Sequence, residues 1–219
     1  LSKNLNTEKV NLSIDKINLV SKLNYNGGKG AGAVSSDLNI DLVSVSKVLG
    51  TLIELSLPKL TGSIIGKLNA DITAPGDTPQ NVLFKSDLKL SDISAENIGN
   101  NIKGNLNSKG SFNVATKALQ ADLNLKEIEG TFTTNKLSSV NGDFALEHNS
   151  QGSKFNTNNL TLNYNGEAVT INSNGQMVGD EIKINSFDVK ILGGSINGDF
   201  GLTNSTKNYR TDTKISSLD

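Results

Sequence analysis

Two related segments are the first candidates for chemistry, "LSSVNGDFAL" at residues 137–146 and "GGSINGDFGL" at residues 193–202. Each joins an Asn-Gly pair to an aspartate, a combination typical of tight turns and of glycine-rich calcium loops. The calcium nonapeptide of parallel β-rolls, however, needs glycine and aspartate where this chain has Ile196 and Gly198. Apolar residues also recur at every second position in both segments, which is the period of a β-strand.

A five-fold repeat favours the strand. The pattern aliphatic-x-Gly-x-(Leu or Phe) recurs along the chain, and the residue before the glycine is Ile, Lys, Glu, Asn and Asn in turn. Only Asn is a turn former, so the five copies share a strand and not a turn. The glycines then lie on the apolar side of their strands: Gly66, Gly104, Gly130, Gly142 and Gly198. Asp143 and Asp199 fall on the polar side, where we expect solvation and no metal.

A glycine inside a strand usually marks a bend, a bulge or a close approach to the backbone. We expect these glycines to let the sheet curl, to leave room for an apolar ligand, or both. An ordinary dry core is the alternative. The candidate lining residues are Ile64, Leu68, Ile102, Leu106, Ile128, Phe132, Val140, Phe144, Ile196, Phe200 and Leu202.

Other catalytic and cofactor-binding patterns are missing from the sequence. The single histidine, His148, is predicted in a loop and cannot by itself form a multi-histidine metal site. The chain has no cysteine, and its acidic residues are scattered without a catalytic signature. The glycine-rich segment 24–32 lacks Gly-Lys-Ser/Thr and a following helix, so it does not resemble a phosphate-binding loop. We therefore expect no enzymatic activity, no metal and no cofactor.

The composition indicates a thin aliphatic core. Of 219 residues, 35% are apolar and 5% aromatic, and tryptophan is absent. The chain has 21 Lys and Arg against 22 Asp and Glu, and these charges are interspersed, which argues against a nucleic-acid surface. The sequence contains no run of about 18 apolar residues that would span a bilayer as a helix.

Alternation of apolar and polar residues predicts many short strands separated by turn segments, hence an all-β, mostly antiparallel fold. The predicted strands include 36–43, 64–74, 82–90, 110–115, 119–125, 159–164, 168–172, 181–191 and 195–203. One segment changes to helical spacing, which predicts a short amphipathic helix over residues 44–55 with Ser44 as its N-cap. We expect a single elongated β domain over 1–219, a fragment of a longer protein.

Two stretches resemble the C-terminal region of the AsmA-like family of Gram-negative envelope proteins, which includes AsmA and TamB. They are "LNIDLVSVSKVLGTLIELSLPKLTGSIIGKLNADITAPG" (38–76) and "FDVKILGGSINGDFGLTNSTKNYRTDTKISSLD" (187–219), together about a third of the chain. The resemblance implies a long, curled antiparallel sheet that forms an open groove with an apolar lining. It also implies a periplasmic protein, anchored in the inner membrane by a segment absent from this chain, that handles phospholipid or another acyl-chain lipid in outer-membrane biogenesis or lipid homeostasis.

The alternative function is a structural or adhesive module, a β-sandwich or solenoid that binds a protein or glycan through loops such as 26–33 and 147–154. In either case we expect exposed edge strands to be available for pairing with another copy of the chain.

Overall fold

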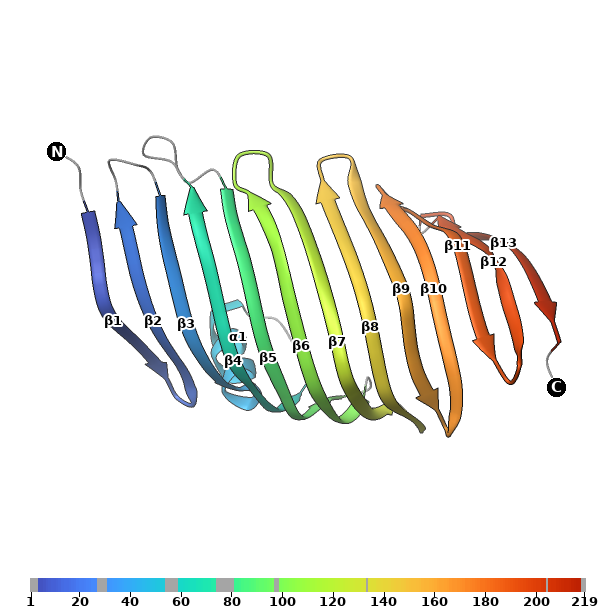
Figure 1. Ribbon diagram of the computed structural model, residues 1–219, viewed down its shortest axis with the longest axis horizontal. Helices are drawn as coiled ribbons and strands as arrows, with labels where there is room; N and C mark the ends of the chain where they lie inside the picture. The colour runs from blue at the N-terminus through green and yellow to red at the C-terminus, as the bar shows by residue number, and fades with distance from the viewer. Residues whose placement is uncertain are drawn as a thin grey trace.

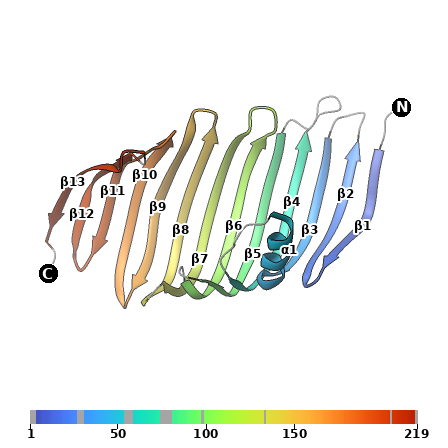
Figure 2. The same ribbon diagram turned by 180° about the vertical axis from the view of Figure 1, so that it is seen from behind.

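The computed structural model describes residues 4–26, 31–53, 59–73, 81–96, 99–132, 134–203 and 205–217, and these residues form thirteen strands and one helix (Figures 1 and 2). The N-terminal elements are β1 (Asn4–Ile14), β2 (Ile17–Asn26), β3 (Ala31–Asp41), α1 (Leu42–Ile53), β4 (Leu60–Thr73), β5 (Asn81–Ala95) and β6 (Gly99–Asn113). The C-terminal elements are β7 (Ala118–Phe132), β8 (Asn135–Asn149), β9 (Gly152–Tyr164), β10 (Glu167–Val178), β11 (Glu181–Ile191), β12 (Gly194–Thr203) and β13 (Asn208–Ser216).

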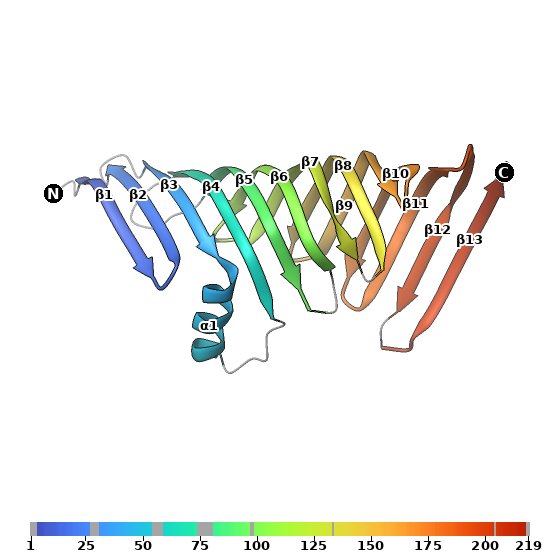
Figure 3. The ribbon, with the colours of Figure 1, turned by 90° about the horizontal axis from the view of Figure 1, so that it is seen from below.

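All thirteen strands belong to one antiparallel sheet in which spatial order follows sequence order from β1 to β13. The expected all-β antiparallel architecture with one short helix is confirmed. β1 pairs only with β2 and β13 only with β12, so the sheet is not closed into a barrel. The described residues form no second sheet, which a β-sandwich would require. Figure 3 shows this single layer bent and twisted along its length.

The Asn-Gly pairs of this chain have different structural roles. Asn165 and Gly166 form the hairpin turn between β9 and β10, and both have positive φ (51° and 98°). The pairs at 141–142 and 197–198 lie inside β8 and β12, as the five-fold repeat predicted. The alternation of apolar residues on either side therefore determines whether an Asn-Gly pair forms a turn or lies inside a strand.

A line of β-bulges crosses the middle of the sheet. Five consecutive strands, β5 to β9, each carry a non-glycine residue with φ between 50° and 55° where the strand pairing slips by a residue. These residues are Asp92, Asn101, Glu127, Ser139 and Asn159. A bulge bends its strand and increases the local twist, so aligned bulges account for the bend of the sheet in this region.

Side chains from adjacent strands bind the backbone N–H groups that the bulges leave unpaired. The Glu127 N–H donates to Oδ1 of Asn141 at 2.9 Å, and the Asn159 N–H donates to Oδ1 of Asn172 at 2.7 Å. The Asn101 N–H donates to Oγ of Ser94 at 3.1 Å. Asparagine inside these strands thus satisfies donors that the ladder cannot.

We predict that Asn141→Ala destabilises the fold, because Asn141 also donates through Nδ2 to the Ser139 carbonyl at 2.8 Å and so supports two bulges. Loss of both hydrogen bonds should lower the free energy of unfolding by about 1–2 kcal/mol in urea titrations followed by circular dichroism. The control is Asn156→Ala, since Asn156 is an exposed strand residue for which the structure shows no side-chain hydrogen bond. Equal effects of the two variants would contradict the bulge-support role.

Few side chains are fully buried. Among the described residues only Leu42, Ala95, Val140 and Val169 are buried apolar residues. The accessible surface is 14149 Å², whereas a compact monomer of this mass would expose about 9,700 Å². Helix α1 contacts β3 and β4 and leaves most of both sheet faces uncovered (Figures 2 and 3).

The helix begins two residues earlier than predicted. It starts at Leu42, and its N-cap is Asp41, not Ser44, because Oδ1 of Asp41 accepts the Ser44 N–H at 2.9 Å. The hydroxyl of Ser44, which is 1% exposed, lies 2.7 Å from Oδ2 of Asp15 in the β1–β2 turn. The helix start is therefore tied to that turn. Residues 54 and 55 of the predicted helix lie outside the described residues.

We predict that the contribution of Asp41 to stability is lost in acid. The Ser44 N–H that donates to its carboxylate lowers the pKa of Asp41 below the ordinary value of 3.8. A carboxyl with a lowered folded-state pKa stabilises the fold above its unfolded-state pKa, and this effect disappears as pH falls through the folded value. The thermal midpoints of the wild type and Asp41→Asn should differ near neutral pH and converge below pH 3.8. A constant difference down to the acid limit would contradict this.

Candidate functional site

The strand register divides the sheet into an apolar face and a polar face. On the apolar face a row of leucines crosses seven strands from β2 to β8 through directly opposed residues. The row is Leu19, Leu38, Gly66, Leu88, Leu106, Leu125 and Gly142. All five leucines are half-buried. The directly opposed leucines are cross-strand neighbours, and the described residues form no second sheet over them.

A second row on the apolar face contains hydroxyl groups that bond to one another. Ser21 and Ser36 are 2.8 Å apart between their Oγ atoms, and Ser86 and Ser108 are 2.6 Å apart. Further along the same row Thr157 lies 3.0 Å from the Oγ of Ser173. Because these hydroxyls pair across strands, they can lie beneath an apolar ligand with their main hydrogen bonds already made.

The structure brings all the predicted lining residues and glycines to this one apolar face. Leu106, Gly66 and Gly142 belong to the leucine row, and Leu68, Phe144 and Gly198 belong to the hydroxyl row. The others lie on the same face in adjacent rows or beyond the bulges: Ile64, Ile102, Gly104, Ile128, Gly130, Phe132, Val140, Ile196, Phe200 and Leu202. The rings of Phe144 and Phe155 stack with centroids 6.2 Å apart.

Each of the five repeat glycines lies close against a neighbouring strand of the sheet. A Cβ on Gly104 would lie 2.8 Å from the carbonyl oxygen of Glu127, and a Cβ on Gly142 would lie 3.1 Å from that of Asn159. Glu127 and Asn159 are bulge residues of the next strand. A Cβ on Gly130 would meet Ile102 at 2.9 Å.

The two remaining glycines of the repeat, Gly66 and Gly198, face backbone atoms of Asp87 and Asp212 on neighbouring strands. Close approach of a neighbouring strand of the same sheet therefore accounts for the recurrence of glycine at these positions.

We predict that Gly198→Ala destabilises the protein and that Gly201→Ala, three residues along the same strand, does not. A methyl group at 198 would displace the β13 backbone at Asp212, whereas a methyl group at 201 would meet no atom within 4 Å. The first change should lower the free energy of unfolding by about 1–3 kcal/mol, and the second should leave it unchanged or raise it by about 0.5 kcal/mol. Urea denaturation measures both, and a neutral Gly198→Ala would refute the close approach.

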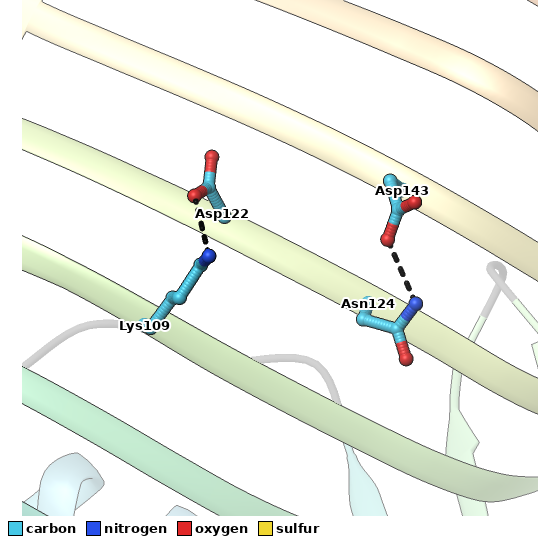
Figure 4. Close-up of polar contacts among 4 residues, drawn as sticks. All are labelled: Lys109, Asp122, Asn124 and Asp143. Atoms are coloured by element: carbon cyan, nitrogen blue, oxygen red, sulfur yellow. Dashed lines mark hydrogen bonds and ion pairs between the residues drawn. The ribbon is translucent and has the colours of Figure 1, made fainter.

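The opposite, polar face carries charged and amide side chains at the intervening positions. Figure 4 shows two of its contacts: Nδ2 of Asn124 donates to Oδ1 of Asp143 at 2.7 Å, and Nζ of Lys109 lies 3.6 Å from Oδ2 of Asp122. These side chains border a shallow depression of about 600 Å³ across β5 to β9. The Lys109–Asp122 pair is largely exposed, so it stabilises the fold little.

A closer ion pair, between Nζ of Lys103 and Oε1 of Glu129 at 2.7 Å, lies on the same polar face. The hydrogen bond between these two groups raises the pKa of Lys103 and lowers that of Glu129.

The described residues include no group of three or more His, Cys, Asp or Glu side chains arranged to hold a metal ion. His148 lies near the end of β8 and not in a loop, and its Nδ1 is 2.9 Å from the hydroxyl of Ser153. No described helix has both the length and the apolar character needed to cross a bilayer. Comparisons with family models, curated proteins and solved structures gave no match to this chain.

Sequence reasoning found only part of the apolar face. It selected residues flanking the glycine repeat and so omitted Leu19, Leu38, Leu88 and Leu125, although their period-2 spacing marks the same side of each strand. It also missed the bulges. A bulge can be recognised in the sequence where the apolar positions change from odd to even numbers beside Asn, Asp, Glu or Ser, as they do between Leu125 and Ile128.

Proposed function

We propose that this chain is a non-enzymatic lipid-handling protein whose apolar sheet face binds the acyl chains of phospholipid or another lipid. One observation carries the proposal: the apolar residues of nearly every described strand gather on a single face, and the described residues form no second sheet to cover it. Exposed apolar surface on this scale is unusual in a monomeric soluble protein and marks a binding surface.

The chemistry of the face favours alkyl chains over polar ligands. Its rows present leucine, isoleucine and phenylalanine side chains, and the hydroxyls among them are paired with one another. An alkyl chain conforms to such a surface and gains up to about 0.8 kcal/mol for each methylene that becomes fully buried. A polar ligand would lose its own hydration there without new hydrogen bonds.

The resemblance of residues 38–76 and 187–219 to the AsmA-like family leads us to place the protein in the periplasm. In this proposal the full-length protein is anchored to the inner membrane and acts in outer-membrane biogenesis or lipid homeostasis. The open single sheet is compatible with the groove that the family likeness implies. The alternative from sequence is a structural or adhesive β-sandwich or solenoid module, and the second sheet that a β-sandwich needs is not found in the described part of the chain.

The direct test is uptake of phosphatidylethanolamine carrying one pyrene-labelled acyl chain, supplied in vesicles and measured by fluorescence of the protein fraction. The wild-type chain should take up the lipid. The double variant Leu88→Gln/Leu106→Gln replaces an opposed pair on the apolar face and should reduce uptake about five-fold or more, since an amide in the binding surface costs about 1 kcal/mol or more.

The matched control is Ile65→Gln/Leu83→Gln, which removes two apolar side chains from the polar face, where they are 47% and 55% exposed. This control should leave uptake unchanged. Circular dichroism confirms that each variant keeps its strand content. No uptake by the wild type, or equal uptake by both folded double variants, would refute the proposal.

A further inference from the structure

Strand β13 is an exposed and regular sheet edge. All nine of its residues are exposed, and its pairing with β12 runs without a register shift from Ser195–Ser216 to Thr203–Asn208. Tyr209 and Ile215, on the apolar face, are 76% and 64% exposed. The outer backbone N–H and C=O groups of such a strand form a template for another strand.

The other edge, β1, is interrupted. Its pairing with β2 shifts between Thr7 and Val10, so β1 carries a bulge in its middle. A bulge twists an edge strand and disrupts the row of outward hydrogen-bonding groups, which is a common protection against edge pairing. The two edges therefore differ, and only β13 offers a continuous ladder.

The charges of β13 lack partners within the described part of the chain. Arg210, Asp212 and Lys214 alternate along the polar face of the strand, and none forms an ion pair there. Asp212 lies directly opposite Asp199 of β12, and like charges at opposed positions destabilise a sheet. A cation on the outer side of Asp212 would offset this repulsion.

We propose that β13 pairs antiparallel with β13 of a second copy of this chain, so that Asp212 lies opposite a cation of that copy. A two-fold axis at Thr213 places Asp212 of each copy opposite Lys214 of the other, which gives two such pairs. An axis at Thr211 places Asp212 of each copy opposite Arg210 of the other and again gives two pairs. An axis at Asp212 is disfavoured, since it opposes the two aspartates to each other and Arg210 to Lys214.

This pairing continues the apolar face across both copies. A two-fold axis perpendicular to the sheet keeps the two apolar faces on the same side, because opposed residues of antiparallel strands share a face. Thirteen strands span about 58 Å and twenty-six about 120 Å at a spacing of about 4.8 Å. In the doubled sheet β1 is the outermost of the described strands on both sides, and its bulge disfavours further edge pairing there.

Cysteine cross-linking tests the pairing and its register, because the native chain has no cysteine. Residues opposed across an antiparallel pair have Cα atoms about 4.5–5.5 Å apart, a separation that a disulfide spans. Thr213→Cys or Thr211→Cys, whichever residue lies on the axis, should give an oxidised dimer on non-reducing gels. Ser13→Cys, on β1, is the edge control. No dimer from either β13 variant, or equal dimer from Ser13→Cys, would overturn the proposal.

Charge exchange provides a test in solution by analytical ultracentrifugation. We expect weak dimerisation of the wild type, with a Kd of about micromolar order for so narrow an interface. Asp212→Lys should weaken it about ten-fold or more while the monomer stays folded, since the new lysine faces Asp199. Asp71→Lys, an exposed change on the interior strand β4, should leave dimerisation unaffected.

Combining Asp212→Lys with Lys214→Asp should restore the dimer if the axis is at Thr213, and combining it with Arg210→Asp should restore it if the axis is at Thr211. A wild type that is monomeric at high concentration, or an Asp212→Lys variant that dimerises as well as the wild type, would overturn the proposal. The readouts do not involve lipid, so the proposal stands or falls separately from the proposed function.

Discussion

The hydrogen-bond ladder between strands that follow one another in the chain is the interaction on which this structure depends. Every strand pairs only with its chain neighbours, and the contacts between elements follow the same order. The fold is thus nearly one-dimensional, like a solenoid, in that each unit is stabilised by the one before and the one after. Such a chain gains backbone hydrogen bonds at low loop-closure cost. The part that the structure describes forms no second sheet to cover the apolar side.

The bulges and the repeat glycines are linked, because a bulge in one strand brings its backbone close to a glycine of the strand before it. Where Glu127 or Asn159 adds a residue to its strand, the displaced backbone approaches the strand before it, and the residue it meets there is Gly104 or Gly142. Asn141 and Asn172 then bind the N–H groups that the bulges leave unpaired. At these positions glycine and asparagine, which strand propensity disfavours, follow from this geometry.

The uncovered apolar face and the regular β13 edge are features that most soluble proteins avoid. The sheet reduces the exposure of its apolar face only in part, through side chains such as Phe144 and Phe155 that stack on each other. It protects the β1 edge with a bulge and leaves the β13 edge straight. An acyl chain on the face and a second copy at the edge would each cover surface that the single chain leaves open.

The sequence by itself determined most of the strands, the short helix and the apolar side of those strands, because alternation is a local property of the chain. It did not predict β13, and the predicted strand 36–43 ends two residues earlier, at Asp41, where the helix follows. It placed Gly142 and Gly198 inside strands correctly by comparison with three copies that lack asparagine before the glycine. It did not determine which atoms of the next strand lie against those glycines or where the bulges fall, because both depend on the register of the neighbouring strand.

Only the tertiary structure decided that five leucines between β2 and β7 form one row, that Asp41 caps the helix, and that the described strands form a single sheet. Composition allowed a dry core between two layers as readily as an open face. The described strands all belong to one sheet that is not closed on itself, and this settled that choice.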